Sequence, residues 1–114
     1  MSIEITARHM EISNGTQDYA RAKADELMRE FPGIEYIHII LDEQRHNKLA
    51  EIVVQARNHI RLEAEEKSDQ IRGSLDSVIN KIERQMRKQH DKLKDHKLTM
   101  RKKEAEKQEF NTDQ

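Results

Sequence analysis

Apolar and polar residues alternate along residues 3–8 and 60–65, and along residues 51–56 with the exception of Val53, which lies on the same side as Glu51 and Gln55. A period of two is typical of a strand with one buried face, so each stretch is predicted to be a strand. Residues 34–41 form a β-branched run with apolar side chains on both faces. This pattern predicts a fourth strand that lies in the interior of the sheet.

Two other stretches have the period of a helix. From about Thr16, apolar positions recur every three or four residues up to Phe31, and the Pro32-Gly33 pair predicts the end of this helix. After Ser68 a second helical stripe begins, with apolar residues Ile71, Leu75, Val78, Ile79, Ile82, Met86 and Leu93. Gly73 costs about 1 kcal/mol relative to Ala within a helix, which predicts an irregular first turn or a later start.

The segments between these elements contain residues that favour caps and turns. Ser13 is a suitable N-cap for the first helix. A hairpin loop is expected at residues 45–48, and Asn58 can adopt the left-handed conformation that a tight turn requires. The resulting order is β-α-β-β-β-α. Because each helix has one apolar stripe, the predicted fold class is α+β, a two-layer sandwich of a four-stranded sheet with both helices on one face.

Composition limits the possible environments of the protein. The 114 residues contain no Cys, which excludes a disulfide or a thiolate metal site and favours a reducing compartment. No apolar run approaches the ~20 residues that cross a bilayer, and the N-terminus has no export signal. We therefore expect a cytoplasmic protein without a membrane partner. Residues 1–97 are predicted to form one domain, and residues 98–114 a polar, disordered tail.

Enzyme chemistry has little support in the sequence. The six His form no pair with metal-ligand spacing, and the three Gly form no phosphate-binding loop. The carboxylates accompany no apolar pocket signal. We therefore expect no catalytic residue, metal, cofactor or small-molecule substrate.

Charge is strongly segregated although the formal net charge is only −1. Residues 1–67 have a net charge of −4, residues 68–103 of +6 and residues 104–114 of −3. On a helical wheel the last helix presents a ridge of cations opposite its apolar stripe, namely Lys81, Arg84, Lys88 and Lys92. Arg87 and Lys94 form a second row beside it. The ridge is either a solvated helix face or a surface that binds phosphates.

Several short segments resemble one family in their order and spacing. They are "MEIS" at 10–13, "AK" at 22–23, "IHIILDE" at 37–43 and "INKIERQMRKQHDKLKDHK" at 79–97. With these segments the chain resembles the short-form ribosome hibernation factors, the ribosome-associated inhibitors once described as sigma-54 modulation proteins. The resemblance implies the same β-α-β-β-β-α fold, which is similar to a double-stranded-RNA-binding domain with an extra strand.

The resemblance also implies a function. Members of this family bind the small ribosomal subunit near the decoding centre, contact ribosomal RNA through basic helix faces, and silence translation in stress or stationary phase. A ribosome-pairing partner protein is possible in this class. By position, the RNA-binding residues would be Lys23 in the first helix and, in the last, Lys81, Arg84, Arg87, Lys88, Lys92 and Lys94. The alternative is a protein-binding modulator of sigma-54-dependent transcription or signalling, which would use the outer sheet residues Arg61, Glu63 and Glu65.

Overall fold

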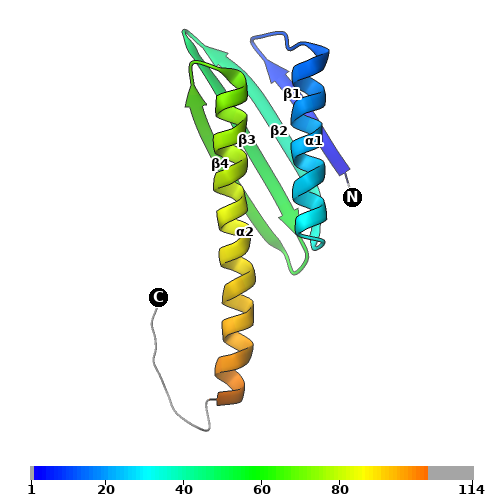
Figure 1. Ribbon diagram of the computed structural model, residues 1–114, viewed down its shortest axis with the longest axis vertical. Coiled ribbons are helices and arrows are strands. Elements are labelled where there is room, and N and C mark those ends of the chain that lie inside the picture. The colour runs from blue at the N-terminus through cyan, green and yellow to red at the C-terminus, as the bar shows by residue number, and fades with distance from the viewer. Residues whose placement is uncertain (1, 103–114) are drawn as a thin grey trace.

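The computed structural model describes the backbone of residues 2–102 and the side chains of residues 2–89. Its elements follow the predicted order and are shown in Figure 1: β1 (Ser2–Arg8), α1 (Asn14–Glu30), β2 (Ile34–Gln44), β3 (Asn47–Ala56), β4 (Ile60–Ser68) and α2 (Ile71–Lys102). The predicted β-α-β-β-β-α order and α+β class are therefore confirmed. The helix α2 continues past residue 97, where the sequence predicted the domain boundary, and residues 103–114 lie outside the described residues.

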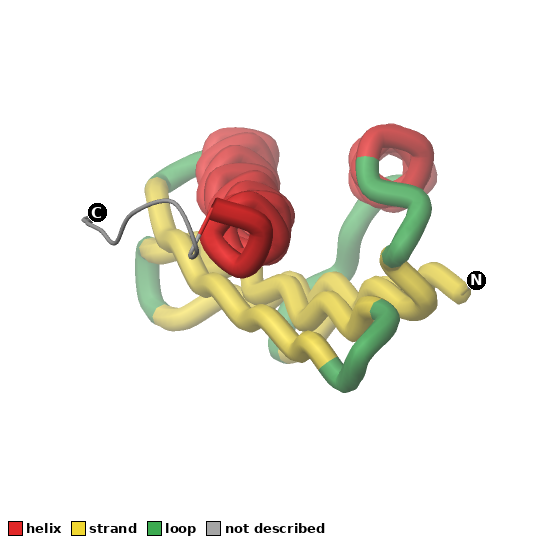
Figure 2. The backbone as a smooth tube through the Cα atoms, turned by 90° about the horizontal axis from the view of Figure 1, so that it is seen from below, coloured by secondary structure: helices red, strands yellow, loops and turns green. Residues whose placement is uncertain are grey.

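The four strands form one mixed sheet in the order β1-β2-β3-β4. The strand β1 pairs with β2 in parallel, and the other neighbours are antiparallel. The prediction that β2 lies in the interior of the sheet is confirmed, because β1 and β3 flank it. Both helices cover the same face, and the opposite face of the sheet is open (Figure 2). The chain thus forms the two layers that its apolar stripes predicted.

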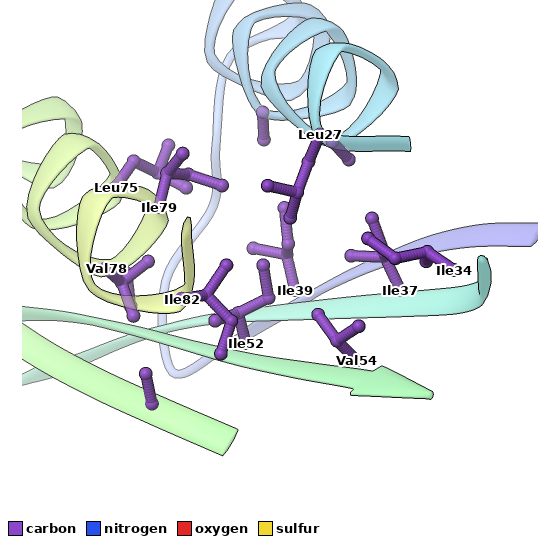
Figure 3. Packing of buried hydrophobic residues seen from close by; sticks show 14 of the residues in the cluster. Leu27, Ile34, Ile37, Ile39, Ile52, Val54, Leu75, Val78, Ile79 and Ile82 are labelled. Carbon is purple, nitrogen blue, oxygen red and sulfur yellow. The ribbon is translucent and has the colours of Figure 1, made fainter. Parts of the chain in front are cut away.

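The core lies between the sheet and the two helices. Figure 3 shows Leu27 of α1 and Ile82 of α2 pointing toward Ile39 and Ile52 of the central strands. Ile82 is 0% exposed and Met86 is 7% exposed, so the predicted apolar stripe of α2 does face the sheet. This packing fixes the rotation of α2 and therefore determines which of its cations reach solvent.

The first helix begins and ends as the sequence predicted. The backbone N–H of Thr16 donates to the Ser13 hydroxyl at 3.1 Å, which confirms Ser13 as the N-cap. At the other end the Phe31 N–H donates to the Leu27 carbonyl at 2.9 Å before the chain turns at Pro32. This end of α1 lies close to the hairpin that joins β3 and β4 (Figure 1).

The start of α2 differs from the prediction. The helix is regular from Ile71 and continues through Gly73, so neither an irregular turn nor a later start occurs. The reason is a close approach of side chains at this turn. A Cβ on Gly73 would lie 3.2 Å from the Ser68 hydroxyl, which hydrogen-bonds to the Ser74 hydroxyl at 2.9 Å. The buried Ser74 hydroxyl also donates to the Lys48 carbonyl at 2.6 Å, which joins α2 to β3.

The hairpin turns contain residues in the left-handed region. Asn58 has a φ of 67°, as predicted, and the adjacent His59 has a φ of 63°. The β2–β3 loop is shorter than expected, because only Arg45 and His46 separate the two strands, and Arg45 has a φ of 58°. Non-glycine residues adopt such values at a cost in free energy, which the surrounding strand pairing must offset.

One carboxylate is buried on the open face of the sheet. Asp42 is 4% exposed and accepts a hydrogen bond from the Glu43 N–H at 2.8 Å. The same oxygen of Asp42 lies 2.9 Å from His9 Nδ1, and its second oxygen lies 3.7 Å from Arg8 Nη2. The hydrogen bond to His9, together with that from Glu43, lowers the pKa of Asp42 below its usual value. Asp42 is therefore a satisfied buried acid.

Neither described helix has the properties of a membrane-spanning segment. Within residues 2–102, neither helix is both long enough and apolar enough to span a bilayer.

Candidate nucleic-acid interface

The helix α2 has three exposed sides, and its cations are divided among them. One side borders β4 and another borders α1, while the third faces away from the sheet. The rotation set by Ile82 and Met86 directs Lys81 toward β4 and Arg87 toward α1. Arg84 lies on the third side. These three environments give the predicted RNA-binding residues different electrostatic partners.

On the side that borders β4, the cation Lys81 is paired with an acid of the strand. Lys81 Nζ lies 3.1 Å from the Glu66 carboxylate of β4, and both side chains are partly exposed. One turn further on, the Gln85 amide donates to the Glu63 carbonyl at 3.4 Å. This side of α2 therefore joins the helix to the edge strand and offers little unbalanced charge.

The side that borders α1 contains a cluster of one cation and two acids. Arg87 donates to the Glu30 carboxylate of α1 at 2.8 Å and lies 3.6 Å from the Glu83 carboxylate. A hydrogen bond between the two carboxyl groups raises the pKa of Glu83 and, with Arg87, lowers the pKa of Glu30. The Glu30 carboxylate in turn raises the pKa of Arg87. Arg87 is thus bound to protein carboxylates.

An aromatic residue joins the other ends of the two helices. The Tyr19 hydroxyl of α1 donates to the Asp76 carboxylate of α2 at 2.5 Å. This hydrogen bond, followed by burial, raises the pKa of Tyr19. The Arg72 guanidinium lies 4.6 Å from the centre of the Tyr19 ring, and Lys23 Nζ lies 5.5 Å from it. Both contacts are cation–π interactions, so Tyr19 positions one cation from each helix.

The third side of α2, called the outer side from here on, contains Arg84 and Lys88, two cations without a carboxylate partner within residues 2–89. Arg84 and Lys88 are both exposed. Within residues 2–89, no carboxylate forms an ion pair with either of them. They are one helical turn apart and so form a pair of adjacent positive charges. Lys92 and Lys94 continue the α2 backbone, but their side chains lie outside the described residues.

The structure therefore divides the predicted set of RNA-binding residues. It brings Arg84 and Lys88 together on the outer side of α2, and it places Lys23 on the surface between the helices. Lys81 and Arg87 lie on the two flanks, each bound to a carboxylate of another element. Sequence reasoning missed Arg72, because its value as a cation depends on stacking with Tyr19, a residue 53 positions away. A helical wheel of α2 alone contains no signal of that contact.

The arrangement suits binding of a polyanion more than catalysis. Adjacent guanidinium and ammonium groups that form no ion pair within residues 2–89 can contact successive phosphates. Within residues 2–89, no group of three His, Asp or Glu side chains could ligate a metal ion. The fold and this surface define a small two-layer α+β protein with two adjacent exposed cations, Arg84 and Lys88, on the last helix.

Comparison with known proteins identifies the family. Residues 3–94 match the family described as "Sigma 54 modulation protein / S30EA ribosomal protein". This match covers most of the chain, and the protein belongs to that family. The resemblance inferred from the sequence is thereby confirmed.

Individual relatives agree with this assignment. The chain is 28% identical over 96 residues to the ribosome hibernation promoting factor of Klebsiella oxytoca, which corresponds to 84% of this chain and all of the relative. It is 25% identical over the same length and coverage to the factor of that name from Escherichia coli strain K12.

Two solved structures share the fold. A ribosomal subunit interface protein from Coxiella burnetii has a TM-score of 0.74 and 23% identity, covering 80% of this chain and 99% of that one. The N-terminal domain of Thermus thermophilus Protein Y has a TM-score of 0.69 and 23% identity, covering 77% and 98% respectively. Both likenesses support the α+β fold class.

Proposed function

We propose that this protein is a ribosome hibernation factor that binds the small ribosomal subunit near the decoding centre. It contacts ribosomal RNA through the outer side of α2 and represses translation in stress or stationary phase, in the cytoplasm. The observation that carries this proposal is the pair Arg84 and Lys88, which is exposed and unpaired within residues 2–89. Family membership and the names of the relatives, which are ribosome hibernation promoting factors, support the ribosome as the polyanion.

The contacts in this proposal are made to the RNA backbone. Lysine and arginine side chains that project from one helix face read phosphate positions and shape, and structured RNA is recognised mainly in this way. Lys92 and Lys94 would extend the same contact along α2. Lys23 and the flank residues Lys81 and Arg87 would contribute after exchanging their protein partners for phosphates.

A second candidate function uses the opposite face. The family description includes modulation of sigma 54, and the open sheet face contains the exposed residues Arg61, Glu63 and Glu65. A protein that binds this face would be a partner in transcription or signalling.

Sedimentation of a cell lysate through a sucrose gradient distinguishes the two candidates. If the protein is a hibernation factor, we expect it in the fractions that contain small subunits or whole ribosomes. Purified small subunits should then bind the purified protein with an affinity that falls steeply as salt rises, because each phosphate contact releases counterions. Migration with a polymerase or kinase, and no binding to purified subunits, would favour the second candidate.

A further inference from the structure

A cavity of about 730 Å³ lies where the end of α1, the β3–β4 hairpin and the middle of α2 meet. Figure 1 shows these three segments at the same end of the sheet. The volume falls within the range of about 300–1,000 Å³ that is usual for sites of small organic molecules. The cavity borders the Arg87 side of α2, so it is continuous with the surface between the helices.

The walls of this cavity combine apolar and amide groups. Phe31 from the end of α1 and Ile60 from β4 are half-buried beside the core, and Met86 from α2 is 7% exposed. Asn58 of the hairpin and Gln89 of α2 also line the cavity, and each offers an amide donor and acceptor. An aromatic ring, a thioether and two amides are suitable contacts for a planar heterocycle with polar edges.

Two arginines border the same cavity. The Arg57 side chain lies across Gly33, since its Nε is 3.6 Å from the position that a Cβ on Gly33 would occupy. Among residues 2–89, Arg57 forms no ion pair with a carboxylate. Arg87 borders the cavity from α2 and is bound to Glu30, whose carboxylate also lines the cavity, so the lining side chains have a net charge of about +1. The cavity therefore has one guanidinium that lacks a described anionic partner and a second that could exchange its partner.

The hairpin beside the cavity has two residues in the left-handed region. Asn58 and His59 both have positive φ values, and Asn and His are among the non-glycine residues that adopt them most often. The pairing of Ala56 with Ile60 closes this three-residue loop and keeps Arg57 and Asn58 next to the cavity.

We propose that this cavity receives a single unstacked nucleotide of RNA, an inference that rests on the proposed function. The base lies against Phe31 and Met86 and uses the amides of Asn58 and Gln89, while Arg57 binds its phosphate. Charge favours a nucleotide over an uncharged apolar ligand, because burying Arg57 beside a neutral molecule would leave the guanidinium without an anion. This contact would add a base-stacking site to the phosphate contacts of Arg84 and Lys88.

Titration of the full chain with nucleoside 5′-monophosphates tests the cavity directly. In amide NMR spectra, the signals of Gly33, Asn58 and Gln89 should shift and saturate at millimolar nucleotide. Inorganic phosphate at the same concentration should shift them much less, because it lacks the base. The proposal is overturned if the nucleotides cause no saturable shift, or if they shift only the signals of the outer side of α2.

Variants of the hairpin test the same site on the ribosome. Arg57→Ala should weaken small-subunit binding by about tenfold, as for a lost charge-assisted hydrogen bond. Asn58→Asp keeps the turn, because Asp also tolerates positive φ, and should weaken binding by placing an anion beside the phosphate. The matched control is Arg61→Ala, which removes a nearby arginine on the open sheet face that is paired with Glu63. Its affinity should equal that of the wild type.

The outcomes separate this inference from the proposed function. If the wild type binds subunits and Lys88→Ala weakens binding, but Arg57→Ala and Asn58→Asp bind like the wild type, the nucleotide site is wrong and the hibernation proposal stands. If the wild type does not bind subunits at all, the hibernation proposal fails. In that case the nucleotide titration alone shows whether the cavity binds a nucleotide.

Discussion

The open face of the sheet and the outer side of α2 are both exposed and both charged, but their charges are arranged differently. On the sheet face the charged groups bind one another: Arg8 lies 3.7 Å from Asp42 and 3.9 Å from Glu51. On the outer side of α2, Arg84 and Lys88 form no ion pair within residues 2–89. The sheet face therefore presents charges that are largely paired, whereas the outer side of α2 presents two cations without a carboxylate partner among residues 2–89.

Other polar groups on the sheet face are also bound to one another. Arg61 Nη2 lies 2.9 Å from the Glu63 carboxylate, and the Tyr36 hydroxyl donates to Glu4 at 2.7 Å. His38 is hydrogen-bonded to the Thr6 hydroxyl at 2.9 Å. A partner that binds the sheet face must break or share these contacts. A phosphate that approaches Arg84 need not break an ion pair formed within residues 2–89, so we expect a smaller free energy cost of binding there.

The largest expected effect tests the rotation of α2, on which the comparison depends. Ile82→Ala should lower the free energy of unfolding by about 2–5 kcal/mol, because Ile82 is fully buried between α2 and the sheet. Urea unfolding of the variant measures this loss. Ser77→Ala, an exposed change on the same helix, is the control and should have a small effect. A wild-type midpoint for Ile82→Ala would mean that this stripe does not face the core.

The next prediction compares the outer side of α2 with the open face of the sheet. Lys88→Ala should weaken small-subunit binding and lower the slope of log affinity against log salt by about one unit, because one phosphate contact is lost. Lys88→Glu should weaken binding more, since it adds a repulsive charge. Glu63→Ala on the sheet face should do little. Affinities at two salt concentrations measure all three.

The reverse ranking would support the modulator function. If Glu63→Ala alters partner binding while both Lys88 variants bind like the wild type, the outer side of α2 is only a solvated helix face. All three variants should keep the wild-type melting temperature, because each side chain is exposed.

Sequence periodicity was sufficient for most of the fold. The alternation of Ile60 and Leu62 with polar residues and the helical spacing of Ile82 and Met86 are local patterns that burial imposes on each element. They predicted the element order, the two layers and the rotation of α2. Gly73 was misinterpreted because its cost in a helix is a local quantity. Its benefit, room for the Ser68 hydroxyl, depends on tertiary packing.

The candidate site could be predicted only in part for the same reason. The helical wheel placed Arg84 and Lys88 opposite the apolar stripe, and the structure agrees. It could not show that Lys81 pairs with Glu66 or that Arg87 pairs with Glu30, because those acids belong to β4 and α1. Their role as RNA contacts remains a prediction.

A smaller effect tests whether a flank cation can join the interface. Glu30→Gln removes the closest acid of Arg87 and should raise small-subunit affinity by up to about fivefold, the range expected for an exposed ion pair. The control is Glu35→Gln, which removes an exposed acid that forms no ion pair with a cation of residues 2–89. Equal affinities for Glu30→Gln and the wild type would mean that Arg87 does not contact the ribosome.

The smallest effect is expected from deletion of residues 100–114. This segment has four basic and four acidic side chains and few apolar ones, so it has little to bury and no net charge to add. The melting temperature should stay nearly unchanged, and the salt dependence of small-subunit binding should remain that of the wild type. Differential scanning calorimetry and the binding assay measure these two quantities. A drop of more than a few degrees would mean that Met100 or Phe110 packs on the core, and the predicted boundary at residue 97 would then be wrong.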